Sequence, residues 1–153
     1  MTLSAEVIRT LQGKTLGAAE SCTGGMIGGE LTAVAGSSAV YKGGIVSYCN
    51  EVKELLLGVP KAVLEEMGAV SAPVAEAMAS GARKALGTDV AVSVTGLAGP
   101  SGDEFGNPVG TVFIGYCDDS TCLSRKFCFD GDREEVRRQA VVQALLLILE
   151  HNR

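Results

Sequence analysis

Short apolar segments with strand character alternate with helical segments along this chain, and this order constrains the fold more than any other feature. Residues 89–95 are apolar at nearly every position, as expected of a strand buried on both faces of a sheet. Residues 72–86 instead place Val74, Met78 and Ala82 on one helical face. The expected strands are residues 15–19, 41–48, 89–95, 109–117 and 122–129, and the expected helices are residues 4–12, 23–32, 51–57, 61–67, 72–86 and 132–150.

The last two expected strands are joined by only four residues, 118–121, which favours an antiparallel hairpin. Alternating strands and helices with one hairpin predict a layered α/β fold with a mixed, mainly parallel sheet. The 153 residues fit one domain, so we expect residues 1–153 to form a single unit. Functional loops of such folds gather beyond the carboxyl ends of parallel strands. Three segments rich in glycine and hydroxyl groups are candidates: residues 20–25, 36–38 and 95–102.

The chain contains one histidine, His151, the third residue from the C-terminus. Chain ends are usually frayed and exposed, so the sequence argues against Ser-His-Asp, Cys-His and His-metal mechanisms. A hydrolase with this sequence needs a lysine, a carboxylate or a chain of water molecules as its base. We expect no metal ion and no cofactor.

The net charge of −5 argues against nonspecific binding of nucleic acid, which needs a basic face. A small anionic ligand would need only one or two local cations. No apolar run is long enough to span a membrane, and the first residues lack the basic and apolar blocks of a signal peptide. We therefore expect a cytoplasmic protein that does not associate with a membrane.

The five cysteines are odd in number and form no C-x-x-C pair. This pattern argues against a disulfide framework and against a zinc site. We expect the cysteines to be small buried apolar side chains in a reducing compartment.

Residues 19–25, with the sequence AESCTGG, follow an expected strand and open an expected helix. Free backbone N–H groups at a helix N-terminus hold an anion or a developing oxyanion, which suits Ser21 as a nucleophile. Helix capping by Ser21 or Thr23 explains the same residues without any chemistry. Cys22 is a rival nucleophile, because a helix N-terminus lowers the pKa of a thiol.

Two further segments carry cations. Lys53 lies on the helix after the strand at residues 41–48, although most lysines are solvated surface groups. Arg133, Arg137 and Arg138 begin the last helix, where they either bind phosphate or form a solvated surface paired with glutamates. Arg133 is the best single phosphate ligand, because it is nearest the helix N-terminus.

The loop at residues 95–102 lacks the G-x-x-x-x-G-K-[ST] order of a phosphate-binding P-loop. Residues 103–107 after it are either a mobile flap or an ordinary exposed loop. The residues by themselves therefore indicate an α/β protein with a plausible anion site and leave its reaction unnamed.

Several segments together resemble the CinA C-terminal domain family of nicotinamide mononucleotide deamidases, often called PncC. The resemblance covers nearly the whole chain, and no single segment would suffice for it. It is carried by AESCTGG (19–25), AGSSAVY (35–41), GGIVSYCNEVK (43–53), LGV (57–59), GAVS (68–71), SVTGLAGPSG (93–102), PVGTV (108–112) and FDGDREEVRRQA (129–140).

The resemblance implies an α/β/α fold and an amidohydrolase that converts nicotinamide mononucleotide to nicotinic acid mononucleotide and ammonia. It implies Ser21 as the nucleophile and Lys53 as its base, acting through an acyl-enzyme. Burial or a nearby cation must then lower the pKa of Lys53. Its implied substrate-binding residues are Ser38, Tyr48, Thr95 and Arg133, with backbone groups of Cys22, Thr23 and Gly24 facing the oxyanion.

This chain departs from the family pattern at Cys49, where serine is usual, at Asp103, where glycine is usual, and at Asn107, where lysine is common. These departures bear on substrate affinity more than on reaction class. The alternative function is a non-catalytic module that binds nucleotides or other proteins. Apart from the small-molecule substrate, we expect a second copy of the chain as the partner, in a homo-oligomer.

Overall fold

The computed structural model describes residues 1–153. Its five strands form one sheet in the order β2-β1-β3-β4-β5. β1 pairs in parallel with β2 and with β3, whereas the β3–β4 and β4–β5 pairs are antiparallel. The sheet is mixed, as predicted, but it is not mainly parallel. The chain returns from β3 to β4 through a loop without a crossover helix, and a parallel pair needs such a crossover. The strands are β1 (Leu16–Glu20), β2 (Tyr41–Val46), β3 (Val90–Gly96), β4 (Thr111–Cys117) and β5 (Cys122–Cys128).

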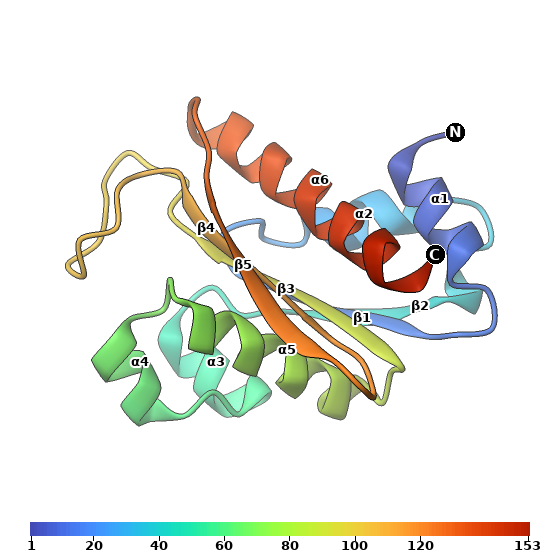
Figure 1. Ribbon diagram of the computed structural model, residues 1–153, viewed down its shortest axis with the longest axis horizontal. Coiled ribbons are helices and arrows are strands. Elements are labelled where there is room, and N and C mark those ends of the chain that lie inside the picture. Colours follow the sequence, from blue (N-terminus) through green and yellow to red (C-terminus); the bar gives the residue numbers. More distant parts are fainter.

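Helices cover both faces of this sheet (Figure 1). One layer consists of α1 (Leu3–Thr10), α2 (Met26–Thr32) and α6 (Arg133–Asn152). The other layer consists of α3 (Asn50–Leu57), α4 (Lys61–Met67) and α5 (Ala72–Leu86). Three layers result, and the loop between β3 and β4 projects beyond one end of the sheet.

The core lies on both sides of β3, which is buried at six of its seven positions. The predicted inward face of α6 is confirmed, because Val136, Ala140, Ala144 and Ile148 are all buried. On the other face, Gly81 of α5 leaves no room for a side chain, since a Cβ there would collide with the Leu57 carbonyl at the end of α3. This close approach fixes α3 against α5.

The predicted start of α6 is confirmed and that of α2 is wrong. Asp132 and Glu135 form the expected capping box. In contrast, α2 begins at Met26 and not at Thr23, because Gly24 and Gly25 adopt positive φ values of 57° and 105° that a right-handed helix excludes. The residues between β1 and α2 are therefore a turn.

The expectation of a frayed His151 is also wrong. α6 continues to Asn152, and the His151 ring stacks on Tyr116 with ring centroids 4.6 Å apart. Its Nδ1 lies 3.1 Å from the Leu147 carbonyl oxygen. These contacts hold the His151 ring between α6 and the sheet.

The cysteines fulfil the expectation only in part. Cys22 is buried, but Cys49 and Cys128 are exposed. Cys117 and Cys122 form a disulfide, which corrects the expectation that the chain has none. The hairpin places these two residues directly opposite each other across β4 and β5, a juxtaposition that cysteine spacing alone does not reveal.

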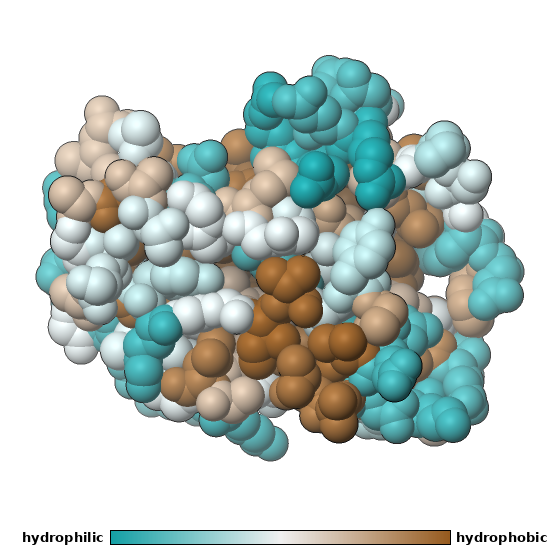
Figure 2. Space-filling view, turned by 180° about the vertical axis from the view of Figure 1, so that it is seen from behind, coloured by the Kyte–Doolittle hydropathy of each residue, from teal (hydrophilic) through white to brown (hydrophobic).

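Exposed apolar side chains gather where β2 ends and α3 runs. Val46, Leu55 and Leu56 are 49%, 77% and 52% exposed. Figure 2 shows hydrophobic residues concentrated in one patch on the face behind that of Figure 1. The expected homo-oligomer stays a prediction. None of the helices combines the length and the apolar character that crossing a membrane requires.

Candidate active site

Ser21 is the first residue after β1, at the carboxyl end of the parallel part of the sheet. Its backbone N–H donates to the Val94 carbonyl of β3 at 3.0 Å, so the sheet hydrogen bonding continues one residue beyond the strand. The side chain is 7% exposed. Ser21 is therefore held rigidly at the point where the chain turns towards α2.

The turn after Ser21 is fastened by the carboxylate of Glu20, which is 2% exposed. One carboxylate oxygen accepts from the Thr23 hydroxyl at 2.7 Å and from the Ile27 N–H at 2.9 Å, and the other accepts from the Gly28 N–H at 3.1 Å. The N-cap residue of α2, Gly25, has no side chain to satisfy those amides. Glu20 supplies the cap from the preceding strand.

Lys53 enters the same region from α3 and is 1% exposed. Its Nζ lies 2.9 Å from the Ser21 Oγ and 2.7 Å from the Ser47 carbonyl oxygen. It forms no ion pair with a carboxylate. The structure thus brings together the two residues that a Ser/Lys pair requires, although they are 32 positions apart in the sequence.

Burial lowers the pKa of Lys53 from 10.5 to about 8, because a charged ammonium loses its hydration there. The nearby Cys49 and Cys22 oppose this shift weakly. Roughly a tenth of the Lys53 amines are then neutral at pH 7, and most are neutral above pH 8. A neutral amine next to a hydroxyl is the arrangement that a general base needs.

Cys22 has the opposite character. It is buried, and this burial raises the pKa of its thiol to about 11. The expected lowering by a helix N-terminus fails, because α2 begins four residues later and desolvation is the largest effect. A neutral thiol is a poor nucleophile, and the Lys53 amine contacts the Ser21 hydroxyl, so Ser21 is favoured over Cys22.

The backbone N–H groups of Cys22 and Thr23, next to Ser21, make no hydrogen bond within the protein. Thr23 is fully buried, whereas Cys22 is 6% exposed, so only the Cys22 amide is accessible to an anion. The Gly24 N–H was expected to face the oxyanion. It donates instead to the Ser21 carbonyl at 3.1 Å and is not available for that role. Arg137 fixes this turn from α6, since its Nε donates to the Cys22 carbonyl at 2.9 Å.

A pocket of about 290 Å³ opens in front of the Ser21 and Lys53 side chains. Tyr48 and Arg133 lie on its rim, where an Arg133 Nη donates to the Tyr48 hydroxyl at 3.2 Å and the other Nη donates to the Gly99 carbonyl. Its remaining lining residues are Cys22, Asn50, Ala69, Val70, Thr95, Gly96, Leu97, Ala98 and Ser101.

The structure does not bring every predicted residue to this pocket. Ser38 is exposed in a 3-10 helix (Ser37–Ala39) before β2. It therefore lies at the amino end of the parallel strands, whereas Ser21 lies at their carboxyl end. The Thr23 hydroxyl points to Glu20. Thr95 lines the pocket, but its hydroxyl donates to the Ala69 carbonyl at 2.8 Å. Arg137 does not line the pocket, so Arg133 is the better placed of the two arginines for a phosphate.

Sequence reasoning missed Ser47, whose carbonyl oxygen holds the Lys53 amine. No side-chain pattern in a sequence marks a backbone carbonyl as an acceptor. Asn50 and Val70 were also missed as lining residues, whereas Leu97 lies within the candidate segment 95–102. Asn50 begins α3, which was the only available signal for it, and Val70 lies between α4 and α5, where the sequence offered none.

A family model matches residues 1–151 of this chain and describes the CinA C-terminal domain. The chain belongs to the CinA C-terminal domain family. A CinA-like protein of Geobacter sulfurreducens is 52% identical over 134 residues, 88% of this chain and 32% of that protein. A CinA-like protein of Synechococcus is 46% identical over 148 residues, 94% of this chain and 35% of that protein.

Solved structures of CinA proteins have the same fold. The competence damage-inducible protein A of Klebsiella pneumoniae superposes with a TM-score of 0.94 at 39% identity and covers 97% of this chain and 93% of its own. The competence/damage inducible protein of Agrobacterium tumefaciens gives 0.92 at 37% identity and covers 100% and 98%. The chain spans about a third of the length of the curated CinA-like relatives.

Proposed function

We propose that this CinA domain is an amidohydrolase that converts nicotinamide mononucleotide to nicotinic acid mononucleotide and ammonia. The observation that carries the proposal is the buried Lys53 amine, 2.9 Å from the Ser21 hydroxyl and without a carboxylate partner. A lysine so placed serves no obvious structural purpose, because burying an amine costs free energy. It does serve a serine that has no histidine to activate it.

The reaction follows from this pair. Neutral Lys53 takes the hydroxyl proton as the Ser21 Oγ attacks the carboxamide carbon. The Cys22 amide, which makes no hydrogen bond within the protein, is the backbone donor for the oxyanion, and the loss of such a donor typically costs about 3 kcal/mol. Protonated Lys53 returns the proton to the departing ammonia. A water molecule, activated by the same amine, then hydrolyses the ester on Ser21.

The pocket suits a phosphate-bearing amide in one orientation. Arg133 is the cation on the rim, so the phosphate belongs there and the carboxamide belongs at Ser21. Arg133 now donates to Tyr48 and to the Gly99 carbonyl, and a phosphate would replace these weaker acceptors. The side chains of Val70 and Leu97 offer apolar contact to the pyridine ring between the two ends.

The test is to incubate the purified chain with nicotinamide mononucleotide and to measure ammonia and nicotinic acid mononucleotide. We expect Ser21→Ala and Lys53→Ala each to lower kcat by a factor of about 10⁴, with the fold retained by circular dichroism. Lys42→Ala, at an exposed lysine of β2, is the matched control.

Three other outcomes would change the proposal. Normal turnover by Lys53→Ala would remove the proposed base. Binding of the nucleotide without any turnover would favour the non-catalytic module. Loss of activity on thiol alkylation, with Ser21→Ala still active, would make Cys22 the nucleophile.

A further inference from the structure

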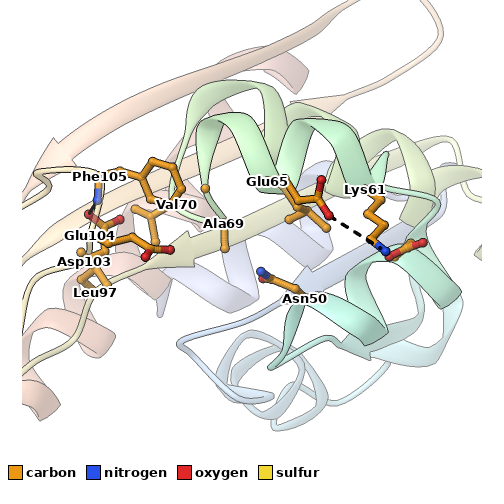
Figure 3. Close-up of a pocket in the computed structure, with 12 residues that line it drawn as sticks. Asn50, Lys61, Glu65, Ala69, Val70, Leu97, Asp103, Glu104 and Phe105 are labelled. Carbon is orange, nitrogen blue, oxygen red and sulfur yellow. Dashed lines mark hydrogen bonds and ion pairs between the residues drawn. The ribbon is translucent and has the colours of Figure 1, made fainter.

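A second cavity, of about 610 Å³, adjoins the Ser21 pocket and is larger than it. We call it the α4 chamber, because α4 forms one of its walls (Figure 3). Phe105, Glu104 and Leu97 line one side of the chamber, and Lys61 and Glu65 of α4 lie on the other. The chamber and the Ser21 pocket share four lining residues: Asn50, Ala69, Val70 and Leu97. A ligand at Ser21 therefore has open space next to it that nicotinamide mononucleotide does not need.

The α4 chamber has an apolar lining formed by Leu64, Val70, Leu97 and Phe105. The Phe105 ring lies against Gly68, where even a Cβ would clash with it. This lining favours a ligand group with aliphatic carbon atoms.

Carboxylates outnumber cations in the chamber. Glu54, Glu65, Asp103 and Glu104 line it together with a single cation, Lys61, which lies 4.0 Å from Glu65. The Asp103 carboxylate is occupied by Asn107 and by the Phe105 N–H, which fixes the loop. The chamber thus repels an anion, whereas the opposite rim of the Ser21 pocket carries Arg133. An elongated substrate has one favourable direction across the site.

Helix α3 connects the reacting groups to the chamber. Asn50 and Glu54 are four residues apart and share one helical face, and Lys53 lies next to Glu54. Asn50 borders both cavities. Lys53 must donate its proton to the leaving nitrogen, so that nitrogen lies on the α3 side of the pocket. A substituent on it would extend past Asn50 into the chamber.

We infer that the α4 chamber is a leaving-amine subsite, through which the chain hydrolyses secondary carboxamides whose nitrogen carries a cationic alkylamine. The inference rests on the proposed amidohydrolase function. Ser21 forms an ester with the acyl group, the carbon–nitrogen bond breaks, and the alkylamine leaves with the proton from Lys53. Water then frees the carboxylate and restores Ser21, so ammonia is replaced by the alkylamine in an otherwise balanced reaction.

The experiment compares N-substituted nicotinamide mononucleotides that carry aminobutyl, pentyl or carboxypropyl groups, with the unsubstituted amide alongside. Mass spectrometry measures the released amine and nicotinic acid mononucleotide at low salt. We expect kcat/KM for the aminobutyl amide to exceed that for the carboxypropyl amide about tenfold, with the pentyl amide between them. In the double variant Glu54→Gln/Glu104→Gln, the ratio of kcat/KM for the aminobutyl amide to that for the carboxypropyl amide should fall at least about threefold. Glu30→Gln, at an exposed position of α2, should leave this ratio unchanged.

Two results would overturn the inference while leaving the proposed function intact. One is hydrolysis of the unsubstituted amide without release of any alkylamine. The other is release of all three amines with no dependence on their charge. If the unsubstituted amide is not hydrolysed either, the proposed function fails and the subsite fails with it.

Discussion

Two ionisable side chains are buried near Ser21, Glu20 at the end of β1 and Lys53 on α3, and their surroundings differ. The Glu20 carboxylate is 2% exposed and accepts three hydrogen bonds from α2 and the turn before it. The Lys53 amine is 1% exposed and has only a hydroxyl and one carbonyl as partners. Neither has an ion-pair partner.

The difference separates a structural charge from a reactive one. A buried charge whose hydrogen-bonding capacity is satisfied stabilises its surroundings, and one that is under-satisfied becomes neutral instead. Glu20 belongs to the first kind, since its carboxylate ties α2 to β1. Lys53 belongs to the second kind, and its lowered pKa is what makes it useful as a base. Substitutions at the two positions should therefore have opposite effects on stability.

The largest stability effect is expected at Glu20. In Glu20→Gln, an amide NH₂ replaces one acceptor and faces either the Gly28 N–H or the donors at Thr23 and Ile27. We expect the free energy of unfolding to fall by about 3 kcal/mol, measured by urea denaturation. Glu30→Gln is the control, because Glu30 is exposed on α2. Equal stability of the two variants would show that the Glu20 carboxylate does not stabilise the fold.

A smaller effect of opposite sign is expected at Lys53. Its pKa is lowered in the folded protein from 10.5 to about 8, so its burial opposes folding at pH values below 8. This cost disappears as the pH rises from 8 towards 10.5. We expect Lys53→Met to raise the free energy of unfolding at pH 7 by about 2 kcal/mol, although it abolishes activity.

The control for this variant is Lys42→Met, at an exposed lysine of β2, which should leave the stability nearly unchanged. The gain in Lys53→Met should shrink when both proteins are unfolded at pH 10. A loss of stability at pH 7 would show that Lys53, like Glu20, holds the fold together.

The smallest effect is expected at Cys22, a buried thiol next to Ser21 in the sequence. Both Glu20 and Lys53 influence its pKa, but burial dominates and raises it to about 11. We expect Cys22→Ala to keep the catalytic activity and to lose about 1 kcal/mol of stability from the small cavity it leaves. Steady-state kinetics checks the first point. A large loss of kcat at unchanged stability would move the reactive centre from Ser21 to Cys22.

Sequence periodicity was sufficient to locate the helices and strands approximately along the chain. The helical face of Val136, Ala140 and Ala144 and the apolar run of β3 both depend on local spacing, and both were predicted. The antiparallel pairing of β3 with β4 was not predicted, because it depends on how the long loop between these two strands returns the chain to the sheet. The Cys117–Cys122 disulfide was missed for a related reason, since it depends on which residues the hairpin places opposite each other.

The site was predictable only where side chains carry the signal. The sequence indicated Ser21 by its place after a strand. The lack of a usable histidine left a lysine, a carboxylate or water as the base, and the resemblance to the CinA family singled out Lys53. It could not show that the Ser47 carbonyl accepts from Lys53 or that the Glu20 carboxylate fastens the turn after Ser21, because both contacts arise from three-dimensional packing. It also placed Ser38 in the site, and this structure leaves that residue exposed elsewhere.

Lys53 should be a neutral amine at mildly alkaline pH. Nuclear magnetic resonance of lysine side chains labelled with ¹³C at the carbon next to the amine measures this directly. We expect one resonance to titrate near pH 8, to be absent from Lys53→Met, and to titrate in parallel with kcat/KM, which should rise with pH up to the same value. If every lysine, Lys53 included, titrates near its ordinary value of 10.5, the proposed base is charged at neutral pH and the account is wrong.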